Sequence, residues 1–241
     1  MDTDNQGAHA AVIGAGGGIG GALVAALAAD DRFVRVHALS RNPAPSSGRI
    51  AAGMIDVTDE ASIAAAAGRI TEPLDLVIIA TGTLHTEGAA PERALRELEA
   101  ATMARQFAVN TIGPALALKH FTPLLHRGER SAIAALSARV GSISDNRTGG
   151  WHSYRASKAA LNMIVRCAAI ELGWSRPQAI CVALHPGTVD TALSRPFQAR
   201  VPAERLFDAA RAARQLLDVI DGLTVQQSGR IFAWDGQEIV P

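Results

Sequence analysis

Tyr154 and Lys158 are the side chains whose types and spacing most directly suggest proton chemistry. Four residues apart on a helix, they would share one face, with the phenol near the ammonium. A tyrosine with a pKa of about 10 needs its phenolate stabilised by roughly 4 kcal/mol to work near pH 7, and a neighbouring positive charge stabilises it in this way. Tyr154 is the only tyrosine in the chain and follows a glycine pair at 149–150. By itself the pair also fits two exposed helix residues, so its meaning depends on the rest of the sequence.

A glycine-rich turn at residues 14–21 follows the first apolar segment, 9–15, and precedes a helical pattern at 19–29. Glycines at such a position let the backbone approach a pyrophosphate, whose charge then lies at the positive end of the next helix. A glycine run alone also fits a flexible turn. Its place between a predicted strand and a predicted helix favours dinucleotide binding.

The residues after the second predicted strand bear on the choice of dinucleotide. A carboxylate there would hydrogen-bond the ribose 2′-hydroxyl and repel a 2′-phosphate. This chain instead has Ser40, Arg41 and Asn42. Arg41 can pair with a phosphate and Ser40 can donate a hydrogen bond to it, so the sequence favours NADP(H) over NAD(H). Arg49 is the alternative arginine for this role, and Arg41 could also be a solvated loop residue.

Apolar segments and helical patterns alternate along the whole chain. Strands are predicted at residues 9–15, 33–39, 48–57, 74–80, 131–137, 179–184 and 229–234. Helices are predicted at 19–29, 59–69 with Thr58 as its cap, from Pro91 onward, 105–126, 154–173 and 207–220. This alternation predicts an α/β fold, a single Rossmann-type doubly wound parallel sheet with helices on both faces, in one domain over residues 1–241.

Composition excludes several classes of function. The 23 basic and 23 acidic residues cancel and only 19% of residues are charged, so no basic field for nucleic acid exists. No apolar run is long enough to span a membrane, and residues 1–9 lack the pattern of a signal peptide. Cys167 and Cys181 are too few for a disulfide framework, which together with these features predicts a cytoplasmic protein. Neither HExxH nor CxxC occurs, so no metal site is predicted.

Several of these motifs occur together in a specific order. Gly14-xxx-Gly18-Ile19-Gly20, Asn110, a serine near the end of the strand 131–137, Tyr154-xxx-Lys158 and Pro186-Gly187 span nearly the whole chain. In this combination the chain resembles the short-chain dehydrogenase/reductase family. Residues 137–163 and 184–191 look more narrowly like its carbonyl-reductase-like branch, which includes C-signal proteins.

The resemblance implies a role for each matching residue. Tyr154 would protonate a carbonyl oxygen during hydride transfer, Lys158 would hold the nicotinamide ribose and lower the tyrosine pKa, and Asn110 would bind a relay water. Asp56 and Val57 would contact the adenine, while Val189 and Thr191 would fix the carboxamide. The cofactor-binding set that we predict is Gly14, Gly16, Gly18, Ile19, Gly20, Ser40, Arg41, Asp56, Val57, Ala80, Thr81, Gly82, Asn110, Tyr154, Lys158, Pro186, Gly187, Val189 and Thr191.

The chain departs from the family pattern at two places. Ile79-Ala80-Thr81-Gly82 replaces Asn-Asn-Ala-Gly, although Gly82 preserves the close approach to the cofactor. At residues 136–139, Leu-Ser-Ala-Arg, alignment on Gly141 places Ala138 at the catalytic serine position, whereas counting from Asn110 places Ser137 there. We favour Ser137, because the loop leading to Tyr154 is longer than usual and can absorb the shift. Ser142 is the second candidate.

The sequence thus predicts an NADP(H)-preferring oxidoreductase that interconverts a small ketone or aldehyde and its alcohol. The resemblance implies that residues 188–207 form the substrate lid and that the helix 154–173 packs against another subunit in a dimer or tetramer, whereas core packing against the sheet also explains many of the same helix residues. The alternative is a dinucleotide-binding signalling or sensor protein of the C-signal type with little turnover. A third interpretation, an assembly subunit with a vestigial site, conflicts with the intact glycine turn.

Overall fold

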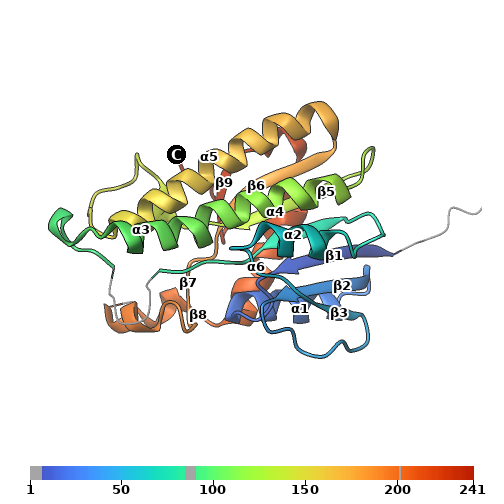
Figure 1. Cartoon of the computed structure of the whole chain (residues 1–241), viewed down its shortest axis with the longest axis horizontal. Helices are drawn as coiled ribbons and strands as arrows, with labels where there is room; N and C mark the ends of the chain where they lie inside the picture. Colours follow the sequence, from blue (N-terminus) through green and yellow to red (C-terminus); the bar gives the residue numbers. More distant parts are fainter. Residues whose placement is uncertain (1–6, 85–90, 201) are drawn as a thin grey trace, which may run out of the picture.

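A parallel sheet of seven strands forms the centre of the molecule (Figure 1). The computed structural model describes residues 7–84, 91–200 and 202–241. The strands lie in the order β3-β2-β1-β4-β5-β6-β9, and every neighbouring pair is parallel. Their bounds are β1 Ala8–Ile13, β2 Phe33–Ser40, β3 Ile50–Met54, β4 Leu76–Ile79, β5 Ser131–Leu136, β6 Ala179–His185 and β9 Ile231–Ala233. This confirms the predicted doubly wound α/β fold.

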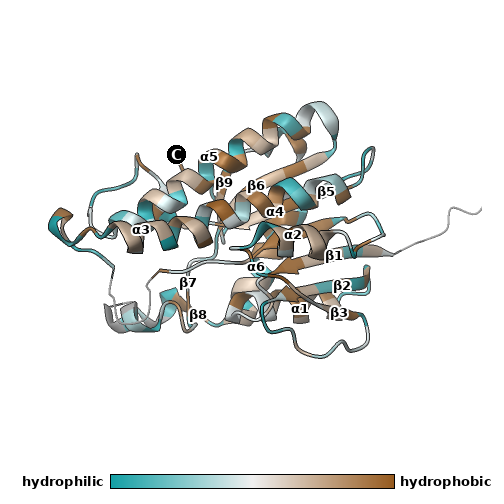
Figure 2. Ribbon diagram, viewed as in Figure 1, coloured by the Kyte–Doolittle hydropathy of each residue, from teal (hydrophilic) through white to brown (hydrophobic). Residues whose placement is uncertain are grey.

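Helices cover both faces of the sheet, because its strands are apolar on both sides. One face carries α2 (Glu60–Ala67), α4 (Gly113–Phe121) and α5 (His152–Ser175), while the other carries α1 (Gly18–Ala29) and α6 (Ala209–Gly222). In β1, for example, Ala11 and Ile13 join the first core and Ala10 and Val12 join the second. The hydropathy colouring shows these apolar strands between the two helical layers (Figure 2).

The strand order reverses between β1 and β4, so the loops after these two strands diverge to opposite faces. Such a switch point leaves a crevice at the carboxyl edge of a parallel sheet, where ligands bind in this class of fold. The glycine turn follows β1 and residues 80–84 follow β4, so both predicted cofactor segments lie at this crevice. The first turn of α5, with Tyr154, opens at the same edge (Figure 1).

Several predicted elements differ in their bounds. Asp59 and not Thr58 caps α2, accepting a hydrogen bond from the Ala61 amide. The region after Pro91 contains only a 3₁₀ turn at Leu95–Glu97 before α3 (Ala100–Phe107). The predicted helix 105–126 is α3, a π turn at Ala108–Ile112, α4 and a short 3₁₀ turn at Thr122–Leu124. Pro114 is the second residue of α4 and lies directly after the π turn, so the helical run continues through the proline.

The predicted lid region contains more regular structure than its loop-rich composition suggests. Thr188–Val189 (β7) and Leu206–Phe207 (β8) pair as a small parallel sheet, and residues 195–200 and 203–205 form 3₁₀ turns. Along the described parts of the chain, none of the helices is both long enough and apolar enough to cross a bilayer.

Candidate active site

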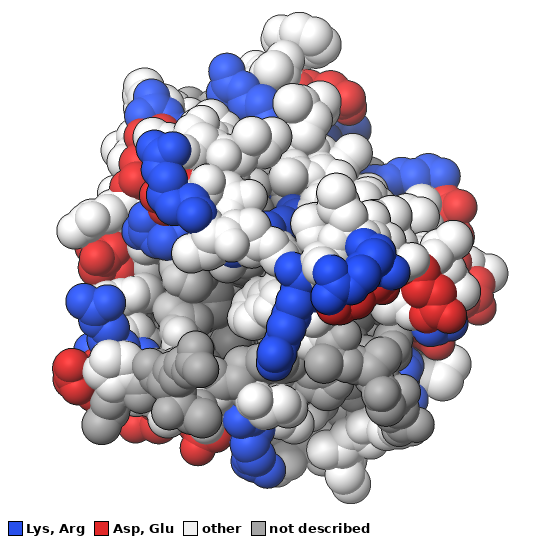
Figure 3. Space-filling view, turned by 90° about the vertical axis from the view of Figure 1, so that its left-hand side faces the viewer, with Lys and Arg blue, Asp and Glu red and all other residues white. Residues whose placement is uncertain are grey.

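A cavity of about 1020 Å³ lies at the crevice between the carboxyl ends of β1 and β4. Seen from that end, the molecule is hollowed, with Lys and Arg side chains around the hollow (Figure 3). Nine of the predicted cofactor residues line it: Gly14, Gly16, Ser40, Arg41, Asp56, Val57, Ala80, Thr81 and Gly82. The structure therefore brings together segments that are up to 68 residues apart along the chain.

The glycine turn leaves space for a dinucleotide, because side chains in place of its glycines would collide with neighbouring atoms. Gly14 has a φ of 96°, and a Cβ there would lie 2.8 Å from the carbonyl oxygen of Ala80. A Cβ on Gly18 would lie 2.7 Å from the Thr191 side chain, so the turn and the segment after β6 meet at this point. The hydroxyl of Thr81, in the cavity wall, is buried without a hydrogen-bond partner among the described residues. These features fit the close approach of a pyrophosphate to the backbone that dinucleotide binding requires.

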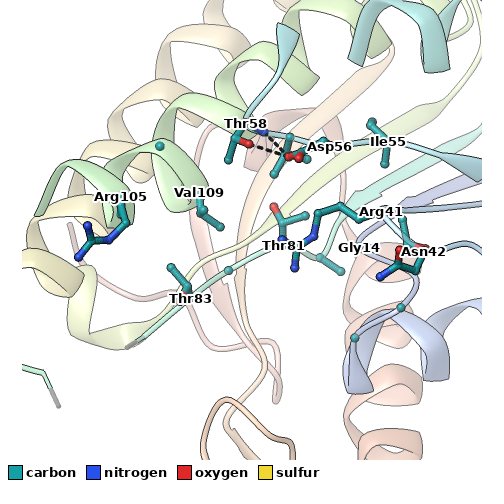
Figure 4. A pocket seen from close by; sticks show the side chains of 17 residues that line it. Gly14, Arg41, Asn42, Ile55, Asp56, Thr58, Thr81, Thr83, Arg105 and Val109 are labelled. Carbon is teal, nitrogen blue, oxygen red and sulfur yellow. Dashed lines mark hydrogen bonds between the residues drawn. The ribbon is translucent and has the colours of Figure 1, made fainter. Parts of the chain in front are cut away.

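The far end of the cavity is formed by the segment after β2. Ser40, Arg41 and Asn42 line it together with Asp56 from the segment after β3 (Figure 4). Hydrogen bonds from the Thr58 amide and hydroxyl hold the pKa of Asp56 below its ordinary value, and the charge of Arg41 adds to this. Arg49, the alternative arginine, is instead bound to Asp31 at 2.8 Å and does not line the cavity.

Tyr154 and Lys158 lie in the first two turns of α5, and both side chains are buried. Desolvation raises the pKa of Tyr154 to about 12 and lowers that of Lys158 to about 7. Lys158 Nζ lies 6.0 Å from the centre of the tyrosine ring and donates a hydrogen bond of 2.7 Å to the carbonyl oxygen of Leu136. Without a ligand, burial favours the neutral form of both groups.

Asn110 connects this pair to the cavity. It occupies the π turn between α3 and α4, a distortion that often marks functional sites. Its side-chain oxygen accepts from the Thr83 amide and its nitrogen donates to the Thr83 carbonyl, both at 2.8 Å. The same nitrogen donates to Ser157 Oγ on α5 at 3.1 Å. Asn110 Oδ1 and Lys158 Nζ would each lie 3.6 Å from a Cβ on Gly82, which lines the cavity.

The amino end of α5 is capped from a distant segment. Three consecutive residues, Gly149, Gly150 and Trp151, have left-handed φ values of 62°, 65° and 51° and turn the chain into the helix. Trp151 caps the helix without a side-chain hydrogen bond. Instead the buried carboxylate of Glu92 accepts hydrogen bonds from the Ser153 hydroxyl and, at 3.4 Å, the Ser153 amide. A carboxylate at this end of a helix is favourable, and it holds the turn that carries Tyr154.

Ser137, the residue predicted to polarise a carbonyl, directs its hydroxyl to another side chain of the protein. Its hydroxyl donates a 2.7 Å hydrogen bond to Asn162 Oδ1 on α5. The next residue, Ala138, forms an apolar cluster with Leu84 and Tyr154. Successive residues of an extended chain face opposite sides, so Ala138 and not Ser137 faces the tyrosine. Ser142 is buried and accepts from the Asp145 amide at 3.1 Å, which gives it a role in its own turn.

A family model of the short chain dehydrogenases matches residues 8–201. The chain belongs to the short chain dehydrogenase family. The match includes both the residues of the glycine turn and the Tyr154–Lys158 pair. It confirms the resemblance found in the sequence and identifies the protein as a dehydrogenase-family oxidoreductase.

Individual relatives agree with this assignment. The chain is 38% identical over 147 residues to the C-signal protein of Myxococcus xanthus, covering 61% of this chain and 82% of the relative. It is 35% identical over 186 residues to 1-hydroxy-2-glutathionyl-2-methyl-3-butene dehydrogenase of Rhodococcus sp. (strain AD45), covering 76% of each. The NADPH-bound carbonyl reductase from chicken fatty liver superposes with a TM-score of 0.81 at 27% identity, covering 98% of this chain and 99% of that one.

The other predicted cofactor residues do not line the cavity, and the structure shows local contacts for several of them. Ile19 packs against the core under α1, and a Cβ on Gly20 would lie 2.1 Å from the Gly14 carbonyl oxygen, so both support the turn. Gly187, which follows Pro186, has a φ of 77° and leaves room for Phe207. The Val189 carbonyl accepts from Ser194 Oγ at 2.5 Å and from Thr191 Oγ1 at 3.5 Å.

Our sequence reasoning missed eight lining residues of this dehydrogenase-family cavity: Gly17, Asn42, Ile55, Thr58, Thr83, Arg105, Ala108 and Val109. Most of them adjoin predicted ones along the chain, which is the signal that could have found them. Arg105 is different, because it comes from α3, one turn before Val109, and adds a second arginine to the wall (Figure 4). Arg105 lies five residues before Asn110 in the predicted helix 105–126, and this spacing is its one signal in the sequence.

Proposed function

We propose that this protein is an NADP(H)-preferring oxidoreductase that interconverts a small ketone or aldehyde and the corresponding alcohol, with Tyr154 as the general acid and base. The observation that carries the proposal is the continuity between the cavity and the buried Tyr154–Lys158 pair. Gly82 lines that cavity, and Asn110 and Lys158 approach Gly82. Tyr154 lies beyond them on the same helix as Lys158.

Different residues of the cavity would bind different parts of the dinucleotide. The glycine turn and the amino end of α1 would hold the pyrophosphate, and Asp56 with Val57 would contact the adenine. Arg41 and Ser40 would bind a 2′-phosphate, since no carboxylate ends β2. When bound, the nicotinamide supplies a hydride to, or removes one from, the carbon of the substrate. The NADPH-bound carbonyl reductase among the structural relatives supports this preference.

Tyr154 would donate its proton to the substrate oxygen during reduction and recover it during oxidation. Its pKa of about 12 must fall for this exchange to be efficient near neutral pH. The Lys158 ammonium is the nearby charge that can lower it, and Asn110 would position a water that returns protons to Lys158. The side chain of Ala138 offers no hydrogen bond, so the Tyr154 hydroxyl would polarise the carbonyl without help from a serine.

Ala138 also favours a second candidate function, a dinucleotide-binding signalling or sensor protein with little turnover. The likeness to C-signal supports it as well. The two functions share the cofactor site and differ in their rate of turnover.

Cofactor binding and turnover test the proposal together. A fluorescence titration should show tighter binding of NADPH than of NADH, and Arg41→Ala should remove most of that difference. Arg49→Ala is the matched control, because Arg49 is bound to Asp31 outside the cavity. With a panel of small ketones and aldehydes, Tyr154→Phe should abolish turnover and keep NADPH binding. Binding without turnover in the wild type would favour the sensor, and binding of neither nucleotide would overturn both functions.

The lid and the subunit contact are part of the same proposal. Residues 188–207 would cover the substrate, since Thr191 of this segment meets the glycine turn at Gly18. A second copy of the chain would cover α5, whose exposed apolar side chains Met163, Ile170 and Trp174 recur at helical spacing. A helix face of this kind is self-complementary under two-fold symmetry.

A further inference from the structure

Two histidines and a glutamate converge at the amino edge of the sheet, opposite the cavity. His9 is near the start of β1, His37 is on β2, and Glu72 is in the segment between α2 and β4. In the parallel register Ala11 pairs with His37, so His9, two residues before Ala11, faces the same side of the sheet as His37. One potential ligand atom from each of the three residues lies within 4.8 Å of the other two.

One ring nitrogen of each imidazole lacks a hydrogen-bond partner in the part of the chain that the structure describes. His9 Nδ1 and His37 Nε2 are both buried and have no hydrogen-bond partner within the described ranges. A buried polar atom without a partner costs free energy, and water or an ion is the usual explanation when one persists. Glu72 is exposed and brings a negative charge to this pair. The cluster therefore combines one exposed carboxylate with two imidazoles, each of which has a buried nitrogen without a partner among the described residues.

From this juxtaposition we infer a binding site for a zinc ion formed by His9, His37 and Glu72, separate from the catalytic cavity. Imidazole nitrogen and carboxylate oxygen are ligands that Zn²⁺ prefers, and three protein ligands leave a fourth tetrahedral position for water. Zinc bonds of about 2.0–2.2 Å place ligand atoms about 3.4 Å apart. The three ligand atoms lie within 4.8 Å of one another, so small side-chain movements would bring them to this separation.

The site would join β1, β2 and the segment before β4 at the edge remote from the reaction. An ion that binds the folded chain and not the unfolded one raises the melting temperature. We therefore expect zinc to act on stability and to leave nucleotide binding at the opposite edge unchanged.

Zinc titration of the metal-free protein tests the inference, with any histidine tag removed. A chromophoric chelator in competition should report one zinc per chain at micromolar or tighter affinity, and zinc should raise the melting temperature. His37→Gln and Glu72→Gln should each weaken binding by roughly tenfold or more. His120→Gln is the control, because His120 lies on α4 beside Glu60, outside the cluster.

Two substitutions keep the zinc site testable even if one of them prevents folding. If His37→Gln does not fold, Glu72→Gln still tests the site, since Glu72 is exposed and its carboxylate accepts only local hydrogen bonds. No saturable binding to the wild type would overturn the site. Wild-type affinity in Glu72→Gln, or equal weakening in His120→Gln, would place the ion elsewhere and overturn it too.

Discussion

Lys158 Nζ lies 6.0 Å from the centre of the Tyr154 ring, and its hydrogen bond goes to the Leu136 carbonyl, a neutral acceptor. A buried ammonium held only in this way is costly, so the pKa of Lys158 falls to about 7. The pKa of Tyr154 rises to about 12 for the same reason. A charged ligand would shift both pKa values, which makes them measurable reporters of the proposed function.

Titration of Tyr154 can be followed without a substrate, because it is the only tyrosine. Absorbance near 295 nm should show a single phenol ionising well above pH 10 in the free protein, as desolvation requires. NADP⁺ should shift the transition to lower pH through its positive nicotinamide. Tyr154→Phe should remove the transition entirely. A free-protein value at or below 10 would contradict the burial that we describe.

The stability of the free protein should rise with pH above 7. The folded pKa of Lys158, about 7, is below its ordinary 10.5, so between these values the unfolded chain binds more protons and unfolding becomes harder as pH increases. Urea unfolding at pH 6.5, 8 and 9.5 measures this trend. Lys158→Met should flatten the rise and be more stable than wild type at pH 6.5. If the free energy of unfolding still rises with pH in Lys158→Met, another group causes the rise.

Restoring a hydroxyl beside Tyr154 should increase turnover. Ala138→Ser places a hydrogen-bond donor in the cluster with Tyr154, and removing one such donor from an enzyme costs about 10²–10³ in kcat. We expect kcat to rise roughly tenfold or more with little change in NADPH affinity. Ser137→Ala is the matched control. It should change kcat less than twofold, which corresponds to about 0.4 kcal/mol in activation free energy. The reason is that the Ser137 hydroxyl donates its hydrogen bond to Asn162. A large loss of kcat in Ser137→Ala would return the catalytic role to Ser137.

Removal of the Glu92 carboxylate should destabilise the start of α5. Glu92→Ala leaves the Ser153 amide and hydroxyl without their acceptor in a buried place, which costs about 1–3 kcal/mol. Chemical denaturation should show this loss, and kcat should fall because Tyr154 is the next residue. Glu171→Ala, at an exposed position of the same helix, should change the unfolding free energy by less than about 0.5 kcal/mol. Equal effects of the two substitutions would argue against the cap.

The α5 surface should hold two copies together. The side chains of Met163 and Trp174 are exposed at 63% and 81% on the same helix face. Sedimentation velocity should show a dimer or tetramer for the wild type and a monomer for the double variant Met163→Glu with Trp174→Glu. Arg214→Glu, on α6, is a control for the change of charge. A wild-type monomer at micromolar concentration would contradict the proposal.

The sequence alone predicted the fold and most of the cofactor cavity because those features depend on short-range patterns. Apolar runs such as residues 74–80 define buried strands, and a parallel sheet follows from their alternation with helices. The glycine turn and Arg41 each directly follow a strand, Ser40 is the last residue of β2, and parallel strands end at one edge. Their meeting in one cavity therefore followed from local order along the chain.

Tertiary structure decided what depends on contacts between distant residues. Counting residues could not show which of Ser137 and Ala138 faces Tyr154, because a shift of one residue turns a side chain to the opposite side. The cap that Glu92 provides for α5 spans 61 residues and has no local signal. The same holds for His9, His37 and Glu72, whose spacing matches no metal motif. Their proximity depends on strand register and on the path of the loop before β4.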